Sequence, residues 1–143
     1  MRRIAALGTR VLRVHRFGDQ RAEAAMTERE RLPTRRRSET FDFDVPVGTT
    51  VLRYTATVGY YLDGRIGELF LNNHKSNSTA DTNARDAAIA FSFAVQHGAD
   101  IEDIRKALCR ETDGRASGPL GAALDLITNA IEPGPVPSPK MTE

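Results

Sequence analysis

Apolar and polar residues alternate along three consecutive stretches in the first half of the chain. Ser38–Val45 alternates two phenylalanines with acidic residues, Thr50–Tyr61 has the most regular alternation, and Arg65–Asn72 follows it. In the second stretch one face carries Leu52, Tyr54, Ala56, Val58 and Tyr60, and the other carries Arg53, Thr55 and Thr57. A period of two is typical of half-buried strands, so the pattern predicts three strands with one apolar face.

Turn residues separate these stretches. Pro46–Thr49 contains a proline and a glycine and predicts the first turn. Asp63 and Gly64 separate the second stretch from the third. Because Asp-Gly readily adopts the positive φ angles of a two-residue hairpin loop, we expect a tight antiparallel hairpin with these two residues as its loop.

The hydrophobic period becomes helical after the third stretch. We expect one helix from near Thr79 to His97, ended by Gly98, and a second helix capped by Asp100. A third helix is expected after Ser117, the predicted cap, with Pro119 in its first turn. The apolar stripes of these helices are Ala84, Ala88, Phe91 and Val95; Ile101, Ile104 and Leu108; and Leu120, Leu124, Ile127 and Ile131.

These elements predict an α+β fold, a three-stranded antiparallel sheet packed against two or three helices. The helices are needed because the apolar face of so small a sheet requires a cover. We expect the domain to span residues 38–132. Residues 1–37 are expected to form a largely disordered basic arm, and the Pro-rich residues 133–143 a disordered tail.

The composition suits one globular domain. The chain has 143 residues, of which 40% are hydrophobic and 27% charged. No apolar run approaches the roughly 18–20 residues that cross a bilayer, so we expect a cytoplasmic protein that does not bind membranes. The single cysteine, Cys109, excludes an internal disulfide and a cysteine-cluster zinc site, and the three histidines lack metal-ligand spacing. We therefore expect no metal and no cofactor.

Arginine dominates the first 37 residues, where acids are few, although the net charge of the whole chain is only +1. A basic arm on an acidic body is either a solvated leader or a contact for an acidic partner. The arm could form a nucleic-acid-binding surface together with two arginines of the sheet. The candidate residues are Arg35, Arg36, Arg37, Arg53 and Arg65.

The loop Asn72–Ser78 joins the last strand to the first helix. Backbone N–H groups at a helix N-terminus attract anions, so this loop is a candidate site for a phosphate or nucleotide ligand. The alternative is an ordinary capped connection, because the loop lacks the glycine pattern of a P-loop. The candidate ligand-binding residues are His74, Lys75, Ser76 and Ser78.

No catalytic set is visible in the sequence. His97 precedes Gly98 and is expected to cap a helix C-terminus, since no nucleophile or acid is placed to work with it. Cys109 ends an apolar stripe and is expected to be a small buried hydrophobe. We therefore name no catalytic residue.

Four segments occur in a distinctive order: RLPTRRR (31–37), GYYLDGRIGELFLNNHK (59–75), ARDAAIAFSFAVQHG (84–98) and ADIEDIRKAL (99–108). They resemble the leading segment, hairpin, main helix and following helix of the C-terminal region of adenosylcobalamin-dependent (class II) ribonucleotide reductases. That module, the TSCPD domain, also occurs as free-standing small proteins. The resemblance covers somewhat over half of the chain.

The chain departs from this family in ways that bear on activity. The Thr-Ser-Cys-Pro-Asp pattern that names the domain is absent, as are the paired cysteines of the reductases, and the chain is too short for their catalytic barrel. A thiyl-radical cysteine and a reducing pair cannot all be supplied by one cysteine. The resemblance therefore implies a non-catalytic accessory or interaction module, linked to deoxynucleotide supply or DNA metabolism.

An open three-stranded sheet has exposed edges and a modest core, so we expect a homodimer or docking onto a larger protein. Two alternatives stay open. One is a nucleic-acid-binding module that uses the arginine-rich arm, and the other is a nucleotide or phosphate sensor at Asn72–Ser78.

Overall fold

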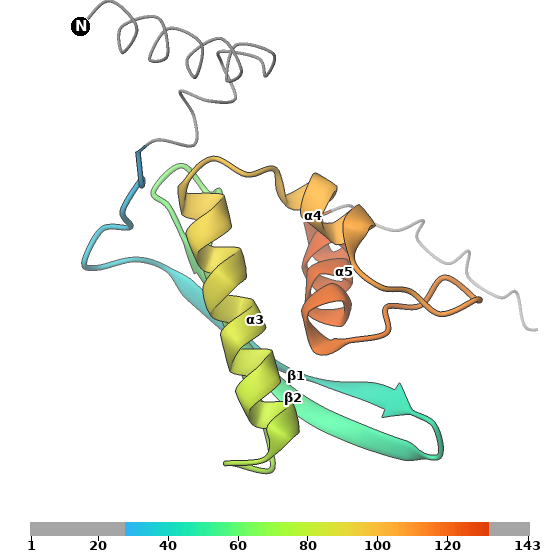
Figure 1. The fold of residues 1–143 in the computed structure, drawn as a ribbon. Coiled ribbons are helices and arrows are strands. Elements are labelled where there is room, and N and C mark those ends of the chain that lie inside the picture. The colour runs from blue at the N-terminus through green and yellow to red at the C-terminus, as the bar shows by residue number, and fades with distance from the viewer. Residues whose placement is uncertain (1–27, 132–143) are drawn as a thin grey trace, which may run out of the picture.

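Three strands form one antiparallel sheet in the order β1-β2-β3 (Figure 1). The structure is a computed structural model, and it describes residues 28–131. Strand β1 spans Ser38–Val47, β2 spans Thr50–Tyr60 and β3 spans Ile66–Asn73. The predicted faces are confirmed, because the apolar positions of β2 from Tyr54 to Tyr60 are buried and the intervening positions up to Thr57 are not.

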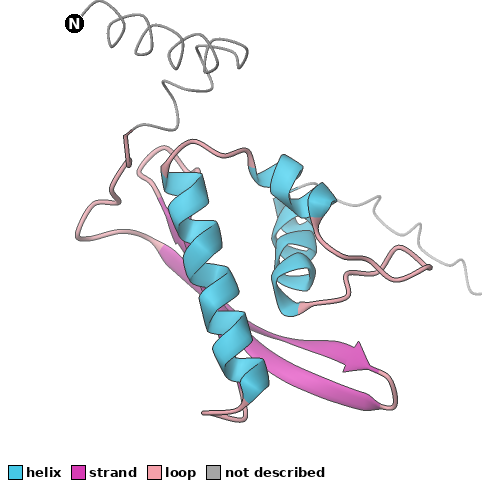
Figure 2. Cartoon of the chain, viewed as in Figure 1, coloured by secondary structure: helices cyan, strands magenta, loops and turns pink. Residues whose placement is uncertain are grey.

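Helices follow the sheet, as expected from the change in hydrophobic period (Figure 2). Helix α3 spans Thr79–Gln96, α4 spans Ile101–Ala107 and α5 spans Pro119–Ile131. The α+β fold class is therefore confirmed. The core lies between the apolar sheet face and the helices, and its most deeply buried large side chains are Val58, Leu69, Leu71 and Leu124.

Helix α3 ends as the sequence predicts. Ser78 is its N-cap and accepts a hydrogen bond from the Asp81 N–H at 3.1 Å. At the other end Gly98 has a φ of 94°, its N–H donates to the Val95 carbonyl, and the Ala99 N–H donates to the Ala94 carbonyl. This pair of bonds is a Schellman motif, which requires the left-handed conformation that glycine adopts without steric cost.

The same helix covers the outer edge of β3. The Ser92 hydroxyl accepts a hydrogen bond from the Leu69 N–H at 2.9 Å and lies 3.1 Å from the Leu69 carbonyl. The Gln96 amide donates to the Gly67 carbonyl at 2.9 Å, and the Asp81 carboxylate accepts from the Asn73 N–H at 3.0 Å. Side chains of α3 thus take the place of a fourth strand along β3.

The hairpin between β2 and β3 differs from the expected two-residue loop. The Tyr61 N–H donates to the Arg65 carbonyl at 2.8 Å, so three residues, Leu62, Asp63 and Gly64, form the loop. Gly64 has a φ of 92°, and the Asp63 carboxylate accepts a hydrogen bond from the Arg65 N–H. The register then shifts, since Gly59 faces Glu68 while Tyr60 faces Ile66, which leaves Gly67 as the extra residue of a β-bulge.

The α4–α5 region needs two corrections. Helix α5 begins at Pro119, so the residue in its capping position is Gly118 and not Ser117. Cys109 is exposed and not buried, because the short helix α4 ends just before it and the chain runs out along the surface. The stripe of α4 is half-buried against the core.

Residues 28–37 have no regular secondary structure, yet they pack against the hairpin and the end of α3. The folded unit therefore begins before residue 38. The expected disorder of the rest of the arm and of the tail concerns residues outside the described range. Within residues 28–131, no helix combines the length and the apolar character that crossing a bilayer requires.

Candidate functional site

Three of the four segments that carry the family resemblance meet at one place, which we call the clamp. It consists of residues 28–37, the β2–β3 hairpin and Gln96. Gln96 is its centre and is only 4% exposed. Its side-chain oxygen accepts from the Arg29 Nε at 2.6 Å, and its backbone carbonyl accepts from the Glu30 N–H at 2.7 Å. Because the Gln96 amide also donates to the Gly67 carbonyl, this side chain joins residues 28–37 to the hairpin.

Arg36 and Glu68 form the second contact of the clamp. The guanidinium donates to the Glu68 carboxylate at 2.5 Å and to the Pro33 carbonyl at 2.9 Å. Glu68 is buried, and it lies over Gly59 on the neighbouring strand, where a Cβ would collide with its side chain. A carboxylate buried this far needs its cation, so Arg36 has a structural role.

The hairpin loop supplies the third contact. Arg65 donates to both Glu30 carboxylate oxygens at 2.9 and 2.6 Å and lies over the Tyr61 ring, 4.7 Å from its centroid. The Tyr61 hydroxyl donates to the Glu30 carbonyl at 2.6 Å. The hydrogen bond from Arg65 lowers the pKa of the Glu30 carboxyl. A Cβ on Gly67 would lie 2.7 Å from Leu32 and 2.8 Å from Tyr61, so the leading segment sits directly on the bulge.

The predicted basic residues do not gather into one surface. Arg36 pairs with Glu68, Arg65 pairs with Glu30 and Asp63, and Arg37 lies over the Tyr60 ring. Arg53 is opposite Asp44 on the polar sheet face, roughly 26 Å along β2 from the Arg65 end of the sheet at about 3.3 Å per residue. Arg35 is exposed. The nucleic-acid surface stays a prediction, because Arg53 lies far from the arm and both Arg36 and Arg65 are already paired with carboxylates.

The predicted anion loop is folded around its own groups. The Ser78 hydroxyl caps α3 and donates to the Lys75 carbonyl at 2.7 Å, while Lys75 and Ser76 are exposed. The buried Asp81 carboxylate already lies at this helix N-terminus. An incoming anion would meet that negative charge. Ligand binding here stays a prediction that the loop geometry does not favour.

His74 points away from that loop and lies on the polar face of the sheet. Its Nε2 is 2.9 Å from the Thr55 hydroxyl and 3.7 Å from the Asp42 carboxylate. Thr55 donates its proton to Asp42 at 2.6 Å and lowers the pKa of that carboxyl. The Thr55 hydroxyl proton is already donated to Asp42, so His74 does not accept it as a general base would. The cluster therefore does not activate Thr55 as a nucleophile.

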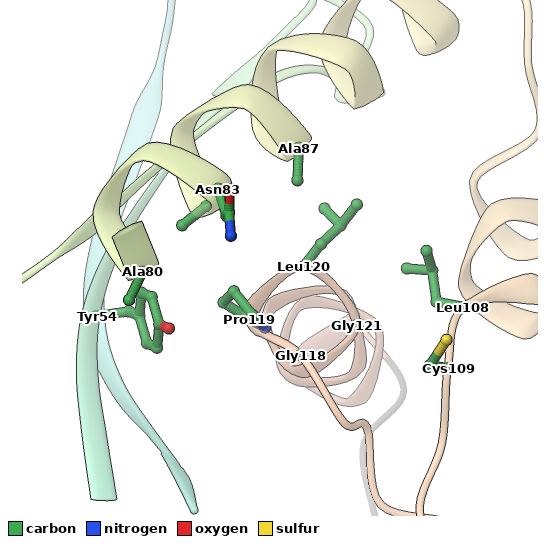
Figure 3. A pocket seen from close by; sticks show the side chains of 11 residues that line it. Tyr54, Ala80, Asn83, Ala87, Leu108, Cys109, Gly118, Pro119, Leu120 and Gly121 are labelled. Atoms are coloured by element: carbon green, nitrogen blue, oxygen red, sulfur yellow. The ribbon is translucent and has the colours of Figure 1, made fainter. Parts of the chain in front are cut away.

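A pocket that the sequence did not predict lies between α3 and the start of α5 (Figure 3). Its volume is about 360 Å³. Alanines of α3 form one wall, the first residues of α5 form the other, and Tyr54 and Cys109 lie at its edges. The only sequence feature that could have indicated this pocket is the set of small residues on both helices. By itself, such a set indicates close helix packing and not a cavity.

Within residues 28–131, no group of three or more His, Cys, Asp or Glu side chains is arranged to hold a metal ion. In the clamp, Arg36 is paired with Glu68 and Arg65 with Glu30. The described part of the chain thus presents a structural junction, an apolar pocket and a polar sheet face.

Comparison with known proteins relates the chain to a region of a much larger enzyme. It is 37% identical over 76 residues to the vitamin B12-dependent ribonucleotide reductase of Agrobacterium fabrum, and 35% identical over 78 residues to that of Bradyrhizobium diazoefficiens. The matches cover 53% and 54% of this chain but only 6% of each enzyme. No protein-family model matches the chain, so the TSCPD assignment stays a prediction. No solved structure matches it.

Proposed function

We propose that the chain is a non-catalytic interaction module, derived from the C-terminal domain of class II ribonucleotide reductases, that binds the reductase polypeptide of its own host. The observation that carries the proposal is the clamp. The residues that give the chain its resemblance to the reductases hold the leading segment on the hairpin, and none of them forms a catalytic set with another described residue.

An exposed apolar surface supplies the contact. Phe70, Ile89 and Phe93 line the groove between β3 and α3 and are 47%, 52% and 46% exposed. We call these three residues the α3–β3 patch. Its position next to the covered edge of β3 leaves side chains, and not free backbone groups, to make the contact.

The choice of partner follows from the share of the relatives that is matched. A module that corresponds to 6% of a long enzyme is joined, in those relatives, to the polypeptide it accompanies. Non-covalent binding of this chain to such a polypeptide depends on a surface patch of this kind. A role in deoxynucleotide supply or DNA metabolism follows from the identity of that partner.

The test is direct binding of the purified full chain to the purified vitamin B12-dependent reductase of the same host. We expect Ile89→Glu to weaken binding at least about tenfold, because it places a charge in a desolvated contact. Leu62→Glu is the matched control, since Leu62 is 89% exposed on the hairpin loop away from the patch. The control should bind like the wild type, and both variants should keep the wild-type melting temperature.

Three results would overturn the proposal: no binding to the reductase, equal loss in both variants, or capture that disappears on nuclease treatment. If the chain does not bind the reductase but self-associates, and Ile89→Glu abolishes that self-association, the homodimer would replace this proposal. Loss of binding on removing residues 1–27 alone would favour the arginine-rich arm.

A further inference from the structure

The pocket between α3 and α5 combines three features that ordinary core packing does not leave together. These are an apolar interior, the side chain of a buried tyrosine whose hydroxyl makes no hydrogen bond to a described residue, and an uncapped helix N-terminus. We propose that this pocket binds a small monoanionic carboxylate with an apolar body. This site is separate from both the clamp and the α3–β3 patch, so it adds to the proposed function.

The walls of the pocket account for the apolar body. Ala87 of α3 faces Leu120 across it, and Leu108 closes one side (Figure 3). At about 360 Å³ the cavity lies at the lower end of the range for small-molecule sites. Hydrogen bonds keep its shape, because the Ser117 N–H donates to the Cys109 carbonyl at 3.0 Å and so fixes the chain before α5.

Tyr54 provides the first polar group. Its side chain is 3% exposed, and its ring stacks on Phe43 with centroids 5.6 Å apart. The hydroxyl lies at one end of the pocket, where it makes no hydrogen bond to a described residue. Buried tyrosine hydroxyls ordinarily find a partner, so this hydroxyl is a donor available to a ligand.

The N-terminus of α5 provides the second set of polar groups. Ser78 and Asp100 cap α3 and α4 through their side chains, but α5 has glycine in the capping position and no acidic residue in its first turn. No described group accepts the N–H of Leu120 or Gly121, and both residues line the pocket. Free N–H groups and the helix dipole favour a negative charge here.

The single negative charge of the ligand follows from the lack of cationic side chains among the described residues of the pocket walls. Among residues 28–131, no lysine or arginine lines the pocket, so a doubly charged phosphate would be poorly neutralised. A carboxylate carries one charge and has four acceptor sites, enough for two N–H groups and the Tyr54 hydroxyl. The exposed amide of Asn83 borders the same space.

The experiment uses Cys109, the only cysteine in the chain, as a reporter because its side chain lines the pocket. The full-length protein is alkylated with iodoacetamide in the presence of phenylacetate or benzoate. At about ten times the dissociation constant, an occupied pocket should slow labelling by up to about tenfold and raise the melting temperature. The matched neutral amides, phenylacetamide and benzamide, should protect much less.

Two variants locate the effect. Tyr54→Phe should weaken carboxylate binding by about three- to tenfold, the value of one hydrogen bond, without lowering the melting temperature of the free protein. Ala87→Leu should fill the cavity and abolish protection while the circular dichroism spectrum is kept. No protection by any carboxylate at millimolar concentration, equal protection by the amides, protection by inorganic phosphate alone, or wild-type behaviour of both variants would each overturn the proposal.

Discussion

Asp125 holds two arginines that come from different parts of the chain. It accepts hydrogen bonds from Arg110 at 2.8 and 2.9 Å and from Arg105 at 3.0 Å. These contacts, Arg110 first, lower the pKa of the Asp125 carboxyl. One half-buried carboxylate thereby ties α4 and the loop after it to α5.

Asp125→Asn should therefore destabilise the protein by about 1–2 kcal/mol at pH 7. A carboxyl with a lowered folded-state pKa contributes stability that is complete above its unfolded pKa of about 3.9 and is lost as the pH falls through the folded value. The gap between variant and wild type in urea unfolding should shrink below about pH 4. Asp86→Asn is the control, since exposed Asp86 forms no ion pair with a described residue. A gap that stays constant with pH would contradict the linkage.

At this scale the sequence predicted positions better than partners. It placed a helix start near Thr79 and helix ends at Gly98 and Asp100, because capping depends on neighbours only a few residues away. It could not predict that Arg65 binds Glu30, 35 residues away, because such a pair depends on the completed fold. The Asp-Gly loop was misjudged for a related reason: glycine at φ 92° fits the end of a three-residue loop as well as a two-residue one.

At the scale of elements, α3 and β3 behave as one unit. Ser92→Ala leaves the Leu69 N–H without its side-chain acceptor on this edge. We expect a loss of about 1–3 kcal/mol in the free energy of unfolding and faster hydrogen exchange at the Leu69 amide.

Thr82→Ala is the matched control for Ser92→Ala. Thr82 is an exposed hydroxyl residue on the same helix, and its side chain makes no hydrogen bond to a described residue. It should change stability by no more than about 0.5 kcal/mol. Equal exchange rates at Leu69 in both variants would show that α3 does not protect the edge.

Periodicity predicted the buried stripe of α3 because apolar positions three and four apart are a local signal. It did not single out Asp81, Ser92 and Gln96, whose importance comes from the backbone groups they meet. Polar residues at a helix edge ordinarily read as solvated, so only the placement of β3 shows their function.

At the scale of the whole molecule, the folded unit includes residues 28–37. A chain lacking residues 1–37 should be at least about 2 kcal/mol less stable than one lacking residues 1–27, because it loses several hydrogen bonds worth about 0.5–1.5 kcal/mol each. Urea unfolding of the two truncated chains measures the difference. Equal midpoints and slopes would mean that the clamp contributes nothing to stability.

The sequence placed the domain boundary at residue 38 because strand periodicity begins there, whereas the clamp is built from an irregular segment with no period to detect. The pocket was missed for the same physical reason. Its walls come from α3 and from the start of α5, more than 30 residues later in the chain, and small residues alone do not distinguish a cavity from tight packing.

The position of α3 makes the two edges of the sheet different. Along β3 the outward backbone groups of Gly67, Leu69 and Asn73 are already bonded to side chains. Along β1 no described strand lies beyond the outer edge, and Asp42, Asp44 and Pro46 are spaced along it. An additional strand from another chain could therefore extend this sheet only past β1, and would meet acidic side chains and an N–H-free proline there. Assembly through strands would thus occur at the β1 edge of the sheet, and assembly through the α3–β3 patch at the β3 edge. One molecule could take part in both.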